Sequence, residues 1–476
     1  MNKKTFIYLL EGAAVSAVST AIMILLFVKG YGDFCHPESA AFLQLYTEKG
    51  KSLLQIIFNP WYTDWGCYQA RELSYFFDWC DAQFIKACIS EGHTHFFSLV
   101  NALFIVATAL VLYFGFLHRM PKLKRAGAAL LTLFFIVAPA TSSSTLYFRS
   151  SKPATAFGIA VAGISAWSLI RRKDKIFSGN NGAWLSLSLS LLLLPYFDRQ
   201  GMFFVSIFCI GSGFVFMFLQ LKSVSPVFSV TKSDFSKLVV FVSLSAFSVI
   251  FATFYNLLIG PGLIHYFNKY DPSFFYQNMG RGLSFLAILN FSRGLHYFLG
   301  NIGFAVSRWP GYGALAIGTS LVAVAVLLCF RYARKKMEGY LLLIVVVMTL
   351  GAMIILANIM TARHPALLQP DVIYSGYFVP TLVVLLILLA ISIEITGDEI
   401  TGKIRIFIYA LLSVIIALNT AVIAIGKTES DRDTDFYHIH SRELIRCLNN
   451  PDRDPEKVKM PYSFLQLIRY FRTEKK

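Results

Sequence analysis

The chain has 476 residues, of which 56% are hydrophobic and only 15% are charged, and its net charge is +16. A soluble protein of this length would have too few polar side chains to cover its core, so the composition excludes an ordinary globular enzyme. Apolar runs recur along the whole chain at lengths near the roughly 20 residues with which a helix crosses roughly 30 Å of hydrocarbon. The sequence therefore predicts an integral membrane protein.

Eleven of these runs predict about eleven transmembrane helices in an all-α, polytopic fold. Seven runs are nearly uninterrupted, and they cover residues 5–28, 96–117, 238–259, 314–330, 340–360, 377–395 and 406–425. Four others are shorter or contain Gly and Ser, and they cover residues 126–138, 154–170, 183–196 and 202–221. No small-residue cleavage site follows the first run, so we expect it to be retained as an anchor.

Basic residues cluster in every second connection between the runs. The clusters are Lys3 with Lys4 and the groups within residues 119–125, 171–175, 222–237, 331–336 and 403–405. The positive-inside rule makes these connections cytoplasmic, so we expect a cytoplasmic N-terminus and an external tail. A further apolar run at 285–306 is not counted, because a crossing there would move the 331–336 cluster outside. We expect that run to lie in the outer interface or to re-enter the membrane.

This topology divides the chain into six parts. They are the first transmembrane helix (1–29), an external loop with amphipathic helices (30–95), transmembrane helices two to seven (96–260), an external or re-entrant segment (261–313), transmembrane helices eight to eleven (314–426) and an external tail (427–476). Most polar residues outside the spans fall in the external parts. We therefore expect any chemistry on the external face.

The first external loop contains a pattern typical of an amphipathic helix. Apolar residues recur every three to four positions, at Leu73, Phe76, Phe77, Cys80, Phe84 and Ala87. Asp78 and Asp81 fall on the other side of the predicted helix, where we expect them to be solvated or salt-bridged.

Four of the seven cysteines, Cys35, Cys67, Cys80 and Cys88, lie in this same loop. An oxidising compartment would allow disulfides there. On one helix the Cα atoms of Cys80 and Cys88 would lie roughly 12 Å apart, beyond disulfide reach, so we expect each to pair with Cys35 or Cys67. Buried free thiols are the alternative. No metal site is predicted, because Cys-x-x-Cys spacing is absent.

Acids and bases near the membrane exits are the candidates for chemistry, since the motifs of nucleotide-binding proteins, serine hydrolases and zinc proteases are absent. Asp33 follows the first span by a few residues, with Glu38 just beyond. A carboxylate in this partly apolar setting gains basicity and could deprotonate an acceptor hydroxyl while a sugar leaves a lipid phosphate. The alternative is a solvated acid at a helix end.

Cations in three short external connections are candidates for binding that phosphate. These residues, with their polar neighbours, are Arg149, Lys152, Asp198, Arg199, Arg363, His364 and Tyr374. Arginine can hold a phosphate through two hydrogen bonds. Asp198 and Arg199 interrupt an apolar stretch, so they mark either a tight hairpin or a charged cavity. Ordinary contact with lipid headgroups is the alternative for the cations.

The long amphipathic first loop, an acid near the outer end of the first span, about eleven helices and an external tail together resemble the polytopic C-type (GT-C) glycosyltransferases. Residues 31–34 look like the first-loop Asp motif of that family, and residues 71–75 look like the Arg-x-Leu-Ser-Tyr segment of bacterial serotype-modifying members. Arg363 with residues 374–380 resembles their late Arg/Tyr-x-x-Pro region. The resemblance implies a polyprenyl-phosphate-sugar donor, Asp33 as the base, and Arg149, Arg199 and Arg363 at the donor phosphate.

The sequence thus predicts a membrane glycosyltransferase that moves a sugar from a polyprenyl phosphate to a cell-envelope glycan, such as lipopolysaccharide, or to a lipid. We expect it in the bacterial inner membrane, with membrane lipids and no nucleic acid as partners; no motif indicates a cofactor or a divalent metal. A flippase or transporter for a lipid-linked saccharide is the alternative, although it would need charges along a path through the bilayer. An O-antigen-type polymerase or ligase would share donor and compartment, and the sequence does not separate it.

Overall fold

The computed structural model describes residues 3–28, 35, 37–47, 50–58, 70–93, 95–146, 150–171, 181–222, 232–269, 378–396, 402–425, 432–458 and 460–474, with a few isolated residues between 316 and 351. Every regular element within these residues is a helix. The predicted all-α class is therefore confirmed for the described part of the chain.

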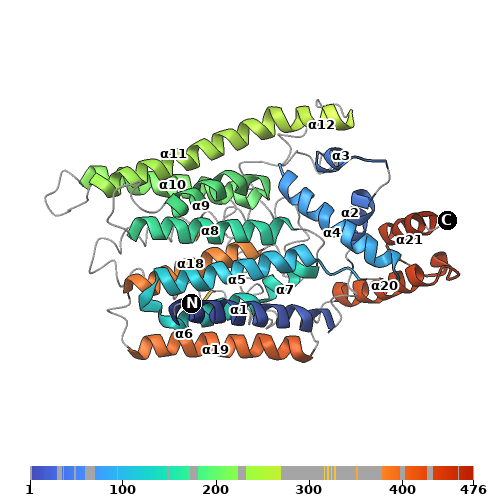
Figure 1. Ribbon diagram of the computed structural model, residues 1–476, viewed down its shortest axis with the longest axis horizontal. Helices are drawn as coiled ribbons and strands as arrows, with labels where there is room; N and C mark the ends of the chain where they lie inside the picture. The colour runs from blue at the N-terminus through green and yellow to red at the C-terminus, as the bar shows by residue number, and fades with distance from the viewer. Residues whose placement is uncertain are drawn as a thin grey trace.

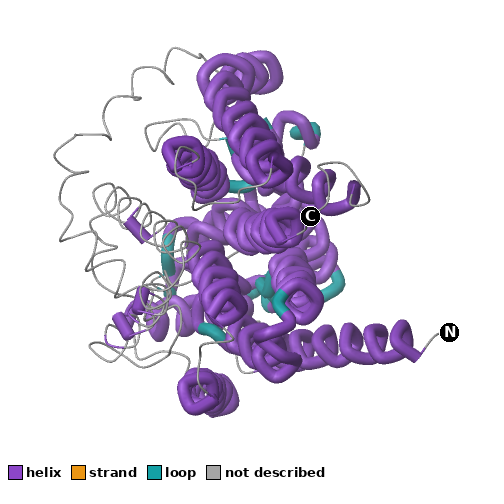
Figure 2. Tube along the Cα trace, turned by 90° about the vertical axis from the view of Figure 1, so that its left-hand side faces the viewer, coloured by secondary structure: helices purple, strands orange, loops and turns teal. Residues whose placement is uncertain are grey.

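Within the described part of the chain, nine helices lie side by side in a bundle (Figure 1). A view along the bundle shows most of them end-on, with α1 splaying away toward the N-terminus (Figure 2). They are α1 (Lys3–Val28), α5 (Leu99–Arg119), α6 (Lys124–Val137), α8 (Ser151–Arg171), α9 (Asn181–Leu193), α10 (Arg199–Lys222), α11 (Lys232–Phe254), α18 (Val379–Thr396) and α19 (Gly402–Ile425). Each coincides with one of the predicted apolar runs.

Six helices in the described residues are long and apolar enough to cross a membrane, and two more, at 182–196 and 379–394, are apolar but shorter. Apart from a few isolated residues, the predicted runs at 314–330 and 340–360 lie outside the described residues, as do residues 270–313 of the 261–313 segment. Membrane-spanning character is thus supported, whereas the number of eleven crossings and the GT-C architecture stay predictions.

Small residues let the inner helices approach closely. In α8 the buried positions include Ala156, Ala160 and Ala162. A Cβ atom added to Gly115 of α5 would lie 2.8 Å from Ile164 of α8, so glycine is needed where these two helices cross. Such small-residue contacts are typical of membrane helices, which gain stability from close packing because the surrounding lipid is as apolar as their side chains.

A second, smaller group of helices lies at one end of the bundle, on the right in Figure 1. We call it the loop–tail subdomain, and it consists of α2 (Pro37–Thr47), α4 (Glu72–Ser90), α20 (Arg432–Asn449) and α21 (Tyr462–Glu474). These helices share a hydrophobic core separate from that of the bundle, with members such as Phe42, Ile85, Leu444 and Phe464. The first loop and the tail therefore lie on the same side of the bundle.

A buried serine ties the loop to the tail directly. The Ser441 hydroxyl of α20 accepts a hydrogen bond from the backbone N–H of Cys35 (2.9 Å) and donates one to the Cys35 carbonyl (3.1 Å). Cys80 and Cys88 on α4 carry free thiols, so the predicted disulfide from this helix is not formed in the structure. Cys35 is instead buried against α20, and Cys67 lies outside the described residues.

Helix α4 was predicted correctly as a helix, but the face expected to be solvated is buried. Asp78 and Asp81 are 5% and 3% exposed, whereas Phe76 and Phe84, on the expected apolar face, are 38% and 44% exposed. The carboxylate of Asp81 accepts hydrogen bonds from the first backbone N–H groups of α5, at Leu99 (3.1 Å). Helix N-termini attract such carboxylates and compensate their burial, while phenyl rings can face lipid at little cost.

Candidate functional site

The N-terminal half of α4 packs on the ends of the bundle helices through polar contacts. The Ser74 hydroxyl donates to the carbonyl of Phe197 (2.6 Å), just before α10, and the Asp78 carboxylate accepts from the backbone N–H of Ser150 (2.6 Å), just before α8. The first loop thus covers the beginnings of α8 and α10.

A buried charge cluster lies under this cover. The Asp198 carboxylate is 3.1 Å from the Arg71 guanidinium of the first loop and 2.7 Å from the Lys152 ammonium of α8. Asp198 has no exposed surface, and the side chains of Arg71 and Lys152 are each only 11% exposed. Two cations therefore share one carboxylate in a setting with little water.

The two cations decide the charge of Asp198. Burial by itself would raise the pKa of this carboxyl, but the charges of Arg71 and Lys152 and a hydrogen bond from the Gln200 backbone N–H hold it well below its usual range. Asp198 is therefore ionised at neutral pH and is a poor proton acceptor. It also cannot itself attract a phosphate, so its part in an anion site is to hold the two cations in place.

The sharp turn between α9 and α10 positions Asp198. A 3₁₀ turn at Leu194–Tyr196 follows α9, and the Asp198 carboxylate then caps α10 by accepting from the backbone N–H of Gln200 (2.9 Å). A Cβ atom at Gly201 would lie 2.0 Å from the Leu194 carbonyl oxygen, so only glycine fits there. The segment is therefore a tight turn, and Asp198 within it lies buried among charges.

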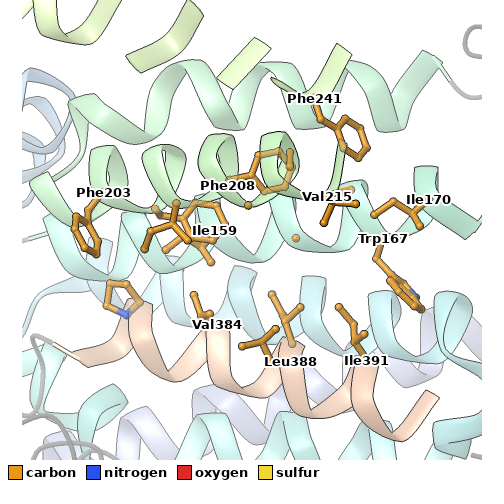
Figure 3. A pocket seen from close by; sticks show the side chains of 18 of the residues that line it. Ile159, Trp167, Ile170, Phe203, Phe208, Val215, Phe241, Val384, Leu388 and Ile391 are labelled. Atoms are coloured by element: carbon orange, nitrogen blue, oxygen red, sulfur yellow. The ribbon is translucent and has the colours of Figure 1, made fainter. Parts of the chain in front are cut away.

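An apolar pocket of about 260 Å³ lies among α8, α10, α11 and α18 (Figure 3). Phe203 lies at one end, and Trp167, Ile170 and Ile391 lie together at the other. Along α10 the lining extends from Gln200 to Val215, a rise of about 22 Å. Because Gln200 follows Asp198 by two residues, this end of the pocket adjoins the charge cluster.

The far end of the pocket is held rigid. The Trp167 indole N–H donates to the carbonyl of Arg119 (3.1 Å), and the Arg171 guanidinium donates to the same oxygen (3.1 Å). Arg171 also pairs with buried Glu394, which accepts from the backbone N–H of Lys122 (2.7 Å). These contacts join the C-terminal ends of α5, α8 and α18 and fix the indole at the pocket end.

Among the predicted site residues, the structure brings Lys152 and Asp198 into contact, and half-buried Arg199 follows as the first residue of α10. Glu38 lies in α2, but its side chain is outside the described part. The other predicted site residues outside the described part are Asp33, Arg149, Arg363, His364 and Tyr374.

Sequence reasoning did not single out Arg71 as a site residue, and it missed the pocket. The available signal for Arg71 was its place in the segment that resembles the Arg-x-Leu-Ser-Tyr motif. Within the described residues no group of His, Cys, Asp and Glu is placed to hold a metal ion.

Comparison with known proteins finds no match to a protein-family model, a curated protein or a solved structure. Support for a function comes from the geometry of the site and from the sequence resemblance.

Proposed function

We propose that the chain is a GT-C-like glycosyltransferase of the bacterial inner membrane that takes its sugar from a polyprenyl phosphate on the external face. The observation that carries the proposal is the junction of the apolar pocket with the buried cations Arg71 and Lys152. A ligand that fits both parts has a long hydrocarbon chain and an anionic head. A lipid phosphate has that chemistry.

The lining of the pocket favours an enzyme over a flippase. Of its lining residues only Gln200, Ser212, Thr381 and the indole of Trp167 carry polar side-chain atoms. A sugar headgroup crossing the membrane would need hydrogen-bonding partners along its whole path. This pocket therefore suits the tail of a lipid carrier, with its head at the charge cluster.

Binding of undecaprenyl phosphate to the purified protein in lipid nanodiscs tests the phosphate site. Lys152→Gln removes a charge-assisted contact, so we expect roughly tenfold to hundredfold weaker binding. Lys86→Gln is the matched control, because Lys86 is also a partly buried lysine that donates to a backbone carbonyl (3.3 Å), but it lies in the loop–tail subdomain. Unchanged binding in Lys152→Gln, or an equal loss in both variants, would reject the phosphate site.

Transfer itself is tested with undecaprenyl-phosphate glucose and lipopolysaccharide as the donor and acceptor probes. Asp33 is the proposed base, so Asp33→Asn should lower turnover by roughly 10² to 10⁴ and leave undecaprenyl phosphate binding unchanged. Glu38→Gln is the comparison that separates the two acids. If both variants keep normal turnover, the first loop does not supply the base.

A further inference from the structure

We infer that the apolar pocket binds the first four isoprene units of the carrier chain, an inference that rests on the proposed lipid-phosphate donor. Gly211 keeps the deeper half of the pocket open, and Trp167 forms the end of the pocket. The occupant is a monophosphate with a single isoprenoid chain. Beyond the fourth unit the chain contributes nothing to recognition by this pocket.

The length of the pocket sets the number of units. An extended chain advances roughly 1.2 Å per backbone bond, so a four-bond isoprene unit covers roughly 5 Å. Four units then cover roughly 20 Å, against about 22 Å along α10 from Gln200 to Val215. With the phosphate near Lys152, a geranylgeranyl chain would reach the Trp167 end, whereas a farnesyl chain would stop near Gly211.

The end of the pocket is a fixed side chain. The Trp167 indole is anchored to the carbonyl of Arg119, and the Arg171 guanidinium lies 5.9 Å from the centre of its ring. Figure 3 shows Trp167 at the end opposite Phe203. A chain that reaches this ring has reached the end of the pocket, where Ile170 and Ile391 also lie.

Gly211 makes the depth testable. It lines the pocket on α10, and a Cβ atom added there would meet no atom within 4 Å. The side chain of a leucine at this position would therefore extend from an unobstructed Cβ atom into the pocket. It would leave the stretch from Gln200 to Gly211, about 16 Å, which accommodates three isoprene units.

Gly213 supplies the matched control. A Cβ atom at Gly213 also has open space, but this residue does not line the pocket, and two residues along a helix point to opposite sides. Both Gly→Leu changes raise helix propensity by a similar amount, so neither should impair folding.

The experiment is a competition series on the purified protein in detergent, with labelled undecaprenyl phosphate displaced by geranyl, farnesyl, geranylgeranyl and unlabelled undecaprenyl phosphate at matched mole fractions in the micelle. The isoprenoid chain moves into the pocket from the micelle interior and not from water, so binding gains no hydrophobic transfer energy. Each isoprene unit inside the pocket should therefore tighten binding only through van der Waals contact, by roughly threefold. In the wild type, affinity should increase with chain length up to geranylgeranyl phosphate and not beyond it. In Gly211→Leu the increase in affinity should stop at farnesyl phosphate, and Gly213→Leu should show the same dependence on chain length as the wild type.

The outcomes separate the two proposals. Two results would refute the four-unit pocket without refuting the donor site. One is binding that requires the phosphate but does not depend on chain length, and the other is a Gly211→Leu series identical to that of the wild type. Equal competition by a two-chain lipid, phosphatidic acid, overturns the single-chain occupant. If the folded wild type binds no prenyl phosphate at all, both the four-unit pocket and the proposed function are refuted.

Discussion

Asp198→Asn removes the negative charge that contacts both Arg71 and Lys152 in the buried cluster. Asparagine keeps the size of the side chain and remains a good helix N-cap, so the turn into α10 should persist. What is lost is the charge that compensates two cations, each about nine-tenths buried. Breaking a buried ion pair by removing one partner costs about 3–5 kcal/mol, and we expect a destabilisation of that size.

The assay is the free energy of unfolding from denaturant titration at a fixed lipid-to-detergent ratio. Asp452→Asn is the control, since Asp452 is exposed in the tail and should change stability by less than about 0.5 kcal/mol. Adding Lys152→Met to Asp198→Asn should recover part of the loss, because one of the two buried cations then disappears. A cost below about 1 kcal/mol for Asp198→Asn, as at exposed ion pairs, would refute the reasoning and mean that water reaches the cluster.

Folding raises the pKa of Asp81 to about 6 through burial, so the folded state binds this proton more tightly than the unfolded state, and stability should fall as pH rises from about 4 to about 6. Asp81→Asn should remove about 1–3 kcal/mol of that fall in unfolding titrations; an unchanged pH dependence would contradict it. Gly201→Ala should destabilise by more than about 3 kcal/mol through its clash with a backbone carbonyl, whereas Gly182→Ala, which has open space, should not. Ser441→Ala should cost about 1–3 kcal/mol and speed amide hydrogen exchange in the first loop, while exposed Ser90→Ala should do neither.

The apolar runs predicted the positions of the bundle helices because the thickness of the bilayer imposes their length. The same pattern in α4 identified a helix but not its buried face. In water the apolar side of a helix turns inward, but in α4 Phe76 and Phe84 are exposed while Asp78 is buried and accepts a hydrogen bond at the beginning of α8. A hydrophobic period alone does not distinguish these two arrangements.

The charge cluster and the pocket depend on tertiary arrangement. Arg71 and Asp198 belong to different parts of the chain, and each looks like an ordinary polar residue near a membrane exit until α4 folds over the end of α10. The pocket exists because the side chains of four helices leave a volume unfilled beside Gly211. Local sequence does not report where such a gap remains.

The hydrogen bonds between Cys35 and Ser441 join residues separated by 406 positions. At a synthesis rate of about 5–20 residues per second, α20 emerges from the ribosome roughly 20–80 s after the first loop. During that interval the apolar side chains of α2 and α4 have no partners from the tail. Assembly of the loop–tail subdomain must therefore wait until α20 and α21 have been synthesised, and a chain truncated before α20 would leave the apolar side chains of the first loop exposed to proteases and chaperones.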